Sequence, residues 1–134
     1  LAGMVRDVNG RRTLYVPATK RLEAFPVDVC ELDTVQVLHL DGHGMGRVDP
    51  CISRLGDLVV LSLNWNGLTA LPDALGSLQR LEELSLLGNP IATIPDGVLT
   101  LPSLKVLDVK STRLGADEIA RIRARRPDLQ LVVR

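Results

Sequence analysis

An internal repeat of 23 residues constrains the fold of this 134-residue chain more than any other feature. When the sequence is shifted against itself by 23 positions, the apolar residues that follow Leu58 coincide with those that follow Leu81. The same pattern begins at Val35 and at Leu104, and a version with one inserted residue near Lys20 precedes them. Self-similarity at a period of roughly 20–50 residues is typical of solenoids, in which each repeat is one unit stacked on the next.

Each repeat combines a short alternating segment with a more widely spaced one. The alternation at Leu61 and Leu63 predicts a strand with one buried face. From Leu71 onward the apolar residues are three or four positions apart, which predicts a short helical or 3₁₀ segment on the opposite side. Stacked repeats would join the strands into one parallel sheet. We expect these strands near residues 37–39, 60–62, 83–85 and 106–108.

A polar position follows each predicted strand, where the chain must leave the sheet. It holds Asn66 and Asn89 in the two clearest repeats, and His43 and Thr112 in the repeats on either side. An Asn side chain can both donate and accept hydrogen bonds at a turn whose backbone groups would otherwise be buried without partners. We therefore predict a structural ladder of these four side chains, imperfect at His43 and Thr112.

The period, the polar position and the Leu71-Pro72 step together resemble the leucine-rich repeat family in its 23-residue form, LxxLxLxxNxLxxLPxxLxxL. The resemblance covers residues 1–114. It implies an α/β solenoid with a parallel sheet on its concave side and short helical or 3₁₀ segments on its convex side. It also implies a scaffold for protein binding, although such repeats serve many unrelated partners.

We expect one domain, residues 1–134, in three parts. The first is either part of a repeat or an N-terminal cap, because Leu1, Val5 and Val8 match the spacing of the last apolar residues of a repeat. The second contains the repeats, and the third is a C-terminal capping helix and strand. These parts are residues 1–10, 11–114 and 115–134.

The C-terminal cap is predicted from residues 117–126, which have acidic residues in the first turn and Arg at the far end, as the helix dipole favours. The segment "LQLVV" then reads as a last strand. Six Arg and three acidic residues leave residues 111–134 at +3, which would suit an anionic partner. A cap that covers the end of the core, like the helix-then-strand endings of bacterial relatives, is the preferred interpretation.

The repeat register also predicts which side chains point out of the concave face. Trp65, the only Trp, follows one strand, and the equivalent positions of the neighbouring repeats hold Gly42 and Gly88. We hypothesise that Trp65 anchors a protein-binding site, because Trp is enriched among interface hot spots. The alternative is that Trp65 lies flat over the two glycines and shields the sheet. The other predicted partner-binding residues are His39, Asp41, Asn64, Glu83, Leu87, Asp108 and Lys110.

Other kinds of site have weaker support. His39, Asp41 and His43 alternate as metal ligands on a strand would, but His43 occupies the ladder position, which leaves two ligands on one face. The Gly-rich stretch Gly42–Gly46 lacks the helix start and GK[ST] of a phosphate loop and fits a degenerate repeat turn. We find no nucleophile beside a base. We therefore expect no enzyme activity, no cofactor and no metal.

Basic and acidic residues number 16 each, which argues against a nucleic-acid partner. No apolar run approaches the roughly 18–20 residues that span a membrane, and Arg6 and Asp7 interrupt any signal peptide. We expect a monomeric, cytoplasmic interaction module. The alternative is the substrate-targeting arm of a larger multidomain effector, ligase-type or kinase-linked and delivered into a host cytosol. Leu rather than Met at position 1 favours this alternative.

The two cysteines, Cys30 and Cys51, are predicted to be free thiols. They lie on the convex side of adjacent coils, two positions out of phase in the repeat. If the coils spread apart on that side, the two Cα atoms lie beyond about 7 Å, too far for an unstrained disulfide. Free thiols would fit a reducing compartment.

Overall fold

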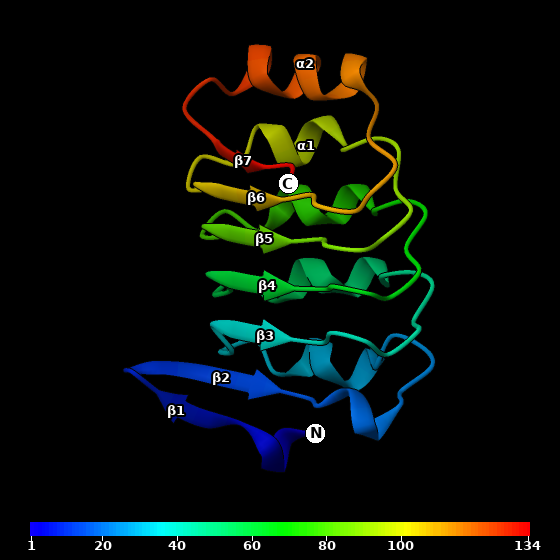
Figure 1. The fold of residues 1–134 in the computed structure, drawn as a ribbon. Helices are drawn as coiled ribbons and strands as arrows, with labels where there is room; N and C mark the ends of the chain where they lie inside the picture. Colours follow the sequence, from blue (N-terminus) through cyan, green and yellow to red (C-terminus); the bar gives the residue numbers. More distant parts are fainter.

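The computed structural model describes residues 1–134 and shows a stack of similar coils (Figure 1). Seven strands form one sheet in sequential order, and neighbouring strands from β2 to β7 are parallel. The four predicted strands are confirmed at the expected residues. The strands are β1 (Arg6–Val8), β2 (Arg11–Tyr15), β3 (Val37–His39), β4 (Val60–Ser62), β5 (Glu83–Ser85), β6 (Val106–Asp108) and β7 (Gln130–Val132).

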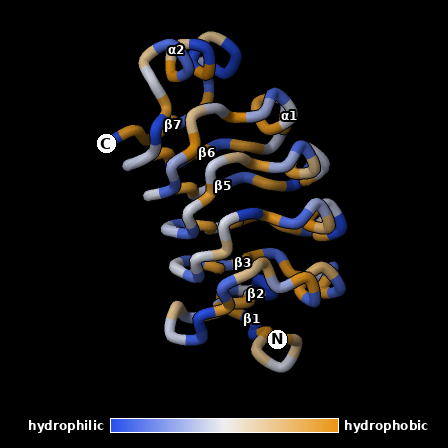
Figure 2. Tube along the Cα trace, turned by 90° about the vertical axis from the view of Figure 1, so that its right-hand side faces the viewer, coloured by the Kyte–Doolittle hydropathy of each residue, from blue (hydrophilic) through white to orange (hydrophobic).

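Short helical segments lie behind the sheet, as Figure 2 shows with β5 and β6 on one side and α1 on the other. Five of the seven helical segments are 3₁₀ helices, and α2 lies at the C-terminal end of the stack (Figure 1). The segments are η1 (Ala2–Met4), η2 (Ala18–Lys20), η3 (Val27–Glu31), η4 (Pro50–Arg54), η5 (Asp73–Ser77), α1 (Asp96–Leu99) and α2 (Ala116–Arg125).

The core lies between the sheet and the convex segments. The central residue of each repeat strand points inward and is buried, as Leu61 and Leu84 illustrate. The convex segments contribute buried apolar residues from the opposite side of the core, as Ile52 and Leu75 illustrate. Buried apolar residues of all the repeats form one continuous cluster. The 23-residue period therefore produces a single core that runs the length of the stack.

The polar position after each strand holds a hydrogen-bonded ladder. Asn66 Oδ1 accepts from the His43 N–H at 2.9 Å, and Asn89 Oδ1 accepts from the Asn66 N–H at 3.0 Å. Each Nδ2 group donates to one carbonyl of the preceding repeat and to one of its own at 2.8–3.0 Å, and Asn66 Nδ2 also lies 3.2 Å from the Asn64 carbonyl oxygen. Both Asn side chains are fully buried. They therefore satisfy backbone groups that have no access to water.

The two ends of the ladder differ from its middle. His43 is buried, its Nδ1 accepts from the Leu22 N–H at 3.2 Å, and its Nε2 lies 2.8 Å from the Val16 carbonyl oxygen. This arrangement fits a neutral ring with its proton on Nε2. Thr112 Oγ1 donates to the Val109 carbonyl at 2.7 Å, within its own repeat. Thr112 therefore closes its own turn without linking to the repeat before it.

The first ten residues form a cap and do not continue the repeat. β1 pairs antiparallel with β2, and Val8 is 48% exposed, so the predicted match of Val8 to a buried repeat position is wrong. The cause is the pair Asn9-Gly10, whose φ angles of 52° and 80° reverse the chain in a two-residue turn. Asn-Gly is the strongest short-range signal for such a hairpin. β1 therefore pairs with the side of β2 that faces away from the repeats.

Three arginines, Arg121, Arg125 and Arg126, bond the C-terminal segment to the repeats that begin at Leu81 and Leu104. The Arg126 guanidinium donates to the carbonyl oxygens of Leu99, Leu101 and Leu104, at 2.7–3.1 Å. Its hydrogen bond to Asp128 lowers the pKa of that carboxyl. The bonds to the three leucines satisfy carbonyl groups at the end of α1 and in the turn that follows it.

Arg121 joins α2 to α1. It bonds Glu118 on its own helix, and it also bonds Asp96 and the Ile94 carbonyl of the repeat that begins at Leu81. The hydrogen bond from Arg121 lowers the pKa of Glu118, and the same bond raises the pKa of Arg121. The helix therefore contacts the repeat through charge-assisted bonds as well as through the buried Ile122.

Cys30 and Cys51 form a disulfide with Cα atoms 5.8 Å apart, so the prediction of free thiols is wrong. Cys30 follows the inward-pointing Val29, and Cys51 precedes the inward-pointing Ile52. A 3₁₀ segment has about three residues per turn, so the residues on either side of an inward one face opposite neighbouring coils. The offset of two positions therefore brings the thiols together.

Small residues continue the same contact between later coils. Gly76 of η5 faces Gly97 of α1, and a Cβ added at Gly76 would lie 3.1 Å from the Gly97 Cα. The convex segments approach closely here, so the coils do not spread apart as the free-thiol prediction assumed. The disulfide also removes the support that free thiols gave to a reducing compartment, because disulfides persist in oxidising ones.

Candidate functional site

The exposed face of the sheet is built by two columns of side chains. The strand register aligns the first and last residues of each three-residue strand with those of its neighbours. The central residues point inward, so these outer residues point out on the concave face. From β2 to β6 the first column is Thr13, Val37, Val60, Glu83 and Val106, and the second is Tyr15, His39, Ser62, Ser85 and Asp108.

Two shallow depressions lie on this face. One of about 470 Å³ extends from the β1–β2 hairpin at Arg11 to Glu83, and one of about 260 Å³ extends from His39 to Asp108. Both are lined by His39, Val60 and Glu83, so they are continuous. We call them together the cross-strand groove, which is lined by Val37, His39, Val60, Glu83, Val106 and Asp108.

Three of the predicted partner-binding residues meet in this groove: His39, Glu83 and Asp108. Asp108 Oδ1 accepts from the Lys110 N–H at 3.0 Å, and the Lys110 Nζ lies 3.5 Å from Asp108 Oδ2. The Lys110 ammonium group is therefore paired with the Asp108 carboxylate. The groove thus combines an apolar floor with acidic groups and one imidazole.

Two other predicted residues, Asp41 and Asn64, form a second ladder. Asp41 Oδ1 accepts from the Ser62 hydroxyl at 2.7 Å and from the Asn64 N–H at 2.8 Å. Asn64 Oδ1 accepts from the Ser85 hydroxyl at 2.7 Å and from the Leu87 N–H at 2.9 Å. Both side chains link successive repeats through their Oδ1 atoms. Asp41 therefore belongs to this second ladder, whereas His43 is buried in the first.

Trp65 lies beyond the end of β4, at the carboxyl edge of the face. It is 58% exposed, and a Cβ added at Gly88 would overlap its indole ring. The ring therefore covers Gly88, as the shielding alternative expects, and still presents more than half of its surface to solvent. Its N–H backbone group donates to the Leu87 carbonyl at 2.9 Å, so the predicted Leu87 lies beside it.

The position of Trp65 requires a left-handed backbone. Its φ is 56°, and φ is 75° at Gly42 and 77° at Gly88, which occupy the same position in the neighbouring repeats. Glycine adopts this conformation without steric cost, whereas a residue with a Cβ loses roughly 1–2 kcal/mol. The chain therefore carries its largest side chain at a position that favours glycine.

Tyr15 is a concave-face residue that the sequence analysis missed. It is 58% exposed at the end of β2, and its ring centroid lies 5.9 Å from that of His39, in an edge-on arrangement. The alternation of Leu14 and Val16 would have placed it on this face. The inserted residue shifts the first repeat, so the strict 23-residue register that begins at Val35 does not include Tyr15, which aligns with His39.

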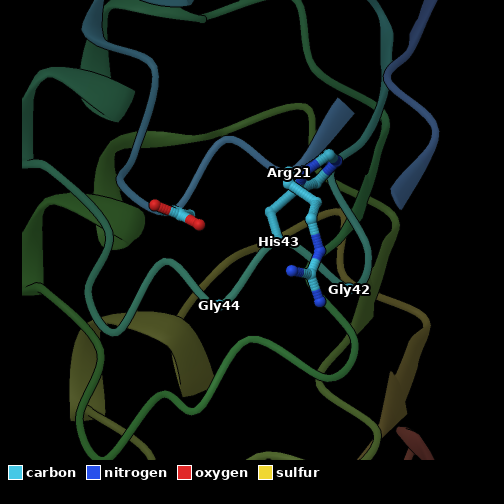
Figure 3. A pocket seen from close by; sticks show the side chains of 5 residues that line it. Arg21, Gly42, His43 and Gly44 are labelled. Carbon is cyan, nitrogen blue, oxygen red and sulfur yellow. The ribbon is translucent and has the colours of Figure 1, made fainter. Parts of the chain in front are cut away.

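A third depression, of about 320 Å³, lies beside the Gly-rich turn and is lined by Arg21, Glu23, Gly42, His43 and Gly44. The Arg21 side chain extends toward Gly42 there (Figure 3). Both ring nitrogens of His43 are already bonded to backbone groups. The charged side chains left in this depression are Arg21 and Glu23. A single cation beside a carboxylate does not form a phosphate-binding site.

None of the helices has the length and apolar character that a bilayer span requires.

The sequence matches no protein-family model and no curated protein. Among solved structures, a leucine-rich repeat protein of Leptospira interrogans is similar, with 34% sequence identity and a TM-score of 0.77 over 81% of this chain and 28% of that one. An internalin of Listeria monocytogenes shares the fold, with 16% identity and a TM-score of 0.63 over 82% of this chain and 31% of that one. The chain thus spans less than a third of the length of either protein. With the 23-residue repeat, the buried Asn ladder and the parallel sheet, these similarities show that the chain belongs to the leucine-rich repeat family.

Proposed function

We propose that this chain is a protein-interaction module that binds a protein partner through the concave face of β2 to β6 and the adjacent carboxyl edge. The observation that carries the proposal is the exposure of the two largest aromatic side chains, Tyr15 and Trp65, each at 58%. The core is built from aliphatic residues together with Phe25, so neither ring is needed there. Exposed aromatic groups within a polar surround are typical of interaction sites.

The backbone at Trp65 supports a binding role for its side chain. A Trp with a left-handed φ costs folding free energy that glycine at the same position would not cost. Strain of this kind is commonly found at functional sites. A partner that covers the outer face of the indole would bury a large apolar area, which offsets that cost on binding.

The disulfide between Cys30 and Cys51 supports an oxidising compartment rather than the cytoplasm that the sequence analysis expected. We propose that the chain meets its partner there. The proposed activity is binding.

Replacing Trp65 by glycine is expected to separate binding from stability. Glycine relieves the left-handed backbone while it removes the ring packed on Gly88, so the free energy of unfolding should change by less than about 1 kcal/mol. Loss of a Trp anchor should weaken binding by about 2 kcal/mol, roughly thirtyfold. The measurements are urea unfolding and titration calorimetry with a partner isolated from the source organism on the wild-type chain.

The matched control is Thr69→Gly, an exposed position that follows the same turn. It should leave affinity unchanged. Unchanged affinity in Trp65→Gly, together with a clear loss of stability, would show that Trp65 serves packing alone.

A further inference from the structure

Glu83 is the one carboxylate on the concave face of β3 to β6 that forms no internal bond. It is exposed, and its side chain takes part in no ion pair or hydrogen bond. The neighbouring acid, Asp108, is paired with Lys110. Asp41, just beyond the end of β3, accepts two hydrogen bonds from the next repeat. Glu83 is therefore the free carboxylate of this face.

Apolar side chains flank this carboxylate on both sides. Glu83 aligns with Val60 on β4 and with Val106 on β6, the strands on either side of β5. Neighbouring strands lie about 4.8 Å apart, so a side chain seated over Glu83 also contacts the two valines. Lys and Arg combine a charged end with an aliphatic stem, which suits a carboxylate between apolar neighbours.

We propose that the cross-strand groove selects a partner segment that presents a Lys or Arg side chain, with Glu83 as its acceptor and Val60 and Val106 as the walls for its stem. This inference rests on the proposed function and adds the chemical class of the residue recognised. Asp108 lies on the adjacent strand in the same depression, and Lys110 balances its charge.

The groove also has a direction. Arg11 lines its other end, beside the β1–β2 hairpin, together with Val8 and Val37. A second cation on the partner would be repelled there, whereas an apolar or acidic residue would be accommodated. The structure therefore favours a segment with its cation over β5 and apolar groups toward β2, where Tyr15 adds aromatic surface.

A random peptide library displayed on phage, selected against the wild-type chain, tests this inference. The selected peptides should be enriched in Lys or Arg at one position next to apolar residues. Glu83→Gln should weaken the best peptide about tenfold, the size of one charge-assisted hydrogen bond. A fresh selection against Glu83→Lys should enrich Asp or Glu at that position. Glu82→Gln is the control, because Glu82 pairs with Lys105 outside the groove and should bind as the wild type does.

Amide chemical shifts of the labelled chain show where the selected peptide lies. Peptides that shift residues of β3 to β6 but bind wild type and Glu83→Gln equally would overturn the cationic preference and leave the proposed function intact. A library that yields no binder, or binders that shift only residues of η3 to η5, would contradict the proposed function and this inference together.

Discussion

Replacing Asn66 or Asn89 by alanine is expected to lower the free energy of unfolding by about 2–3 kcal/mol. Asn66→Ala leaves the buried His43 N–H and Leu40 carbonyl without their partner, and Asn89→Ala leaves the N–H groups of Asn66 and Leu68 without theirs. A single unsatisfied buried group costs roughly 1–3 kcal/mol. Urea unfolding monitored by circular dichroism would measure the loss.

Thr112→Ala provides the comparison for the ladder. Thr112 is only half-buried and bonds within its own repeat, so its removal should cost about 1 kcal/mol or less. Small and equal losses in all three variants would mean that the ladder does not hold the repeats together.

Reducing the disulfide is expected to lower the free energy of unfolding by about 3 kcal/mol. Cys30 and Cys51 are 21 residues apart, and a loop of that length loses roughly this much entropy in the unfolded chain when it is closed. Unfolding in urea with and without a phosphine reductant measures the effect. A Cys30→Ala, Cys51→Ala double variant should unfold like the reduced wild type and should not respond to the reductant.

Mass spectrometry of the purified chain accompanies that comparison. The untreated protein should weigh about two daltons less than the reduced protein, the mass of the two thiol hydrogens. Free thiols in the untreated protein, with the same unfolding midpoint in both conditions, would contradict the disulfide and the oxidising compartment inferred from it.

The four strands β3 to β6 were predictable because the period places each of them once two repeats are aligned. Leu61 and Leu84 must both point inward, and this sets the register of the whole sheet. The N-terminal hairpin was missed for the same reason: extending the apolar match to Val8 passed over Asn9-Gly10, a local turn signal that outweighs three apolar positions. The disulfide was missed because the repeat register gives positions along the chain only. It does not show that adjacent residues of a 3₁₀ segment point in different directions around its axis.

The candidate site was only partly predictable. Strand alternation places His39, Glu83 and Asp108 on one face, and the structure brings them into one groove. The repeat pattern does not show that Asp41 and Asn64 bond to the next repeat, since such bonds depend on side-chain rotamers. Whether a ring lies over Gly88 or projects from it also depends on packing in three dimensions.

Site-specific photo-crosslinking tests the claim that the concave face is the binding surface. p-Benzoylphenylalanine in place of Tyr15 would sit on that face, and in place of Val27 it would sit on the convex side at a similar exposure, 58% against 55%. Each variant is irradiated in an extract of the source organism and analysed by mass spectrometry. The account predicts a specific protein adduct from position 15 that unlabelled wild-type chain competes away, and none from position 27. An adduct from position 27 alone would contradict it.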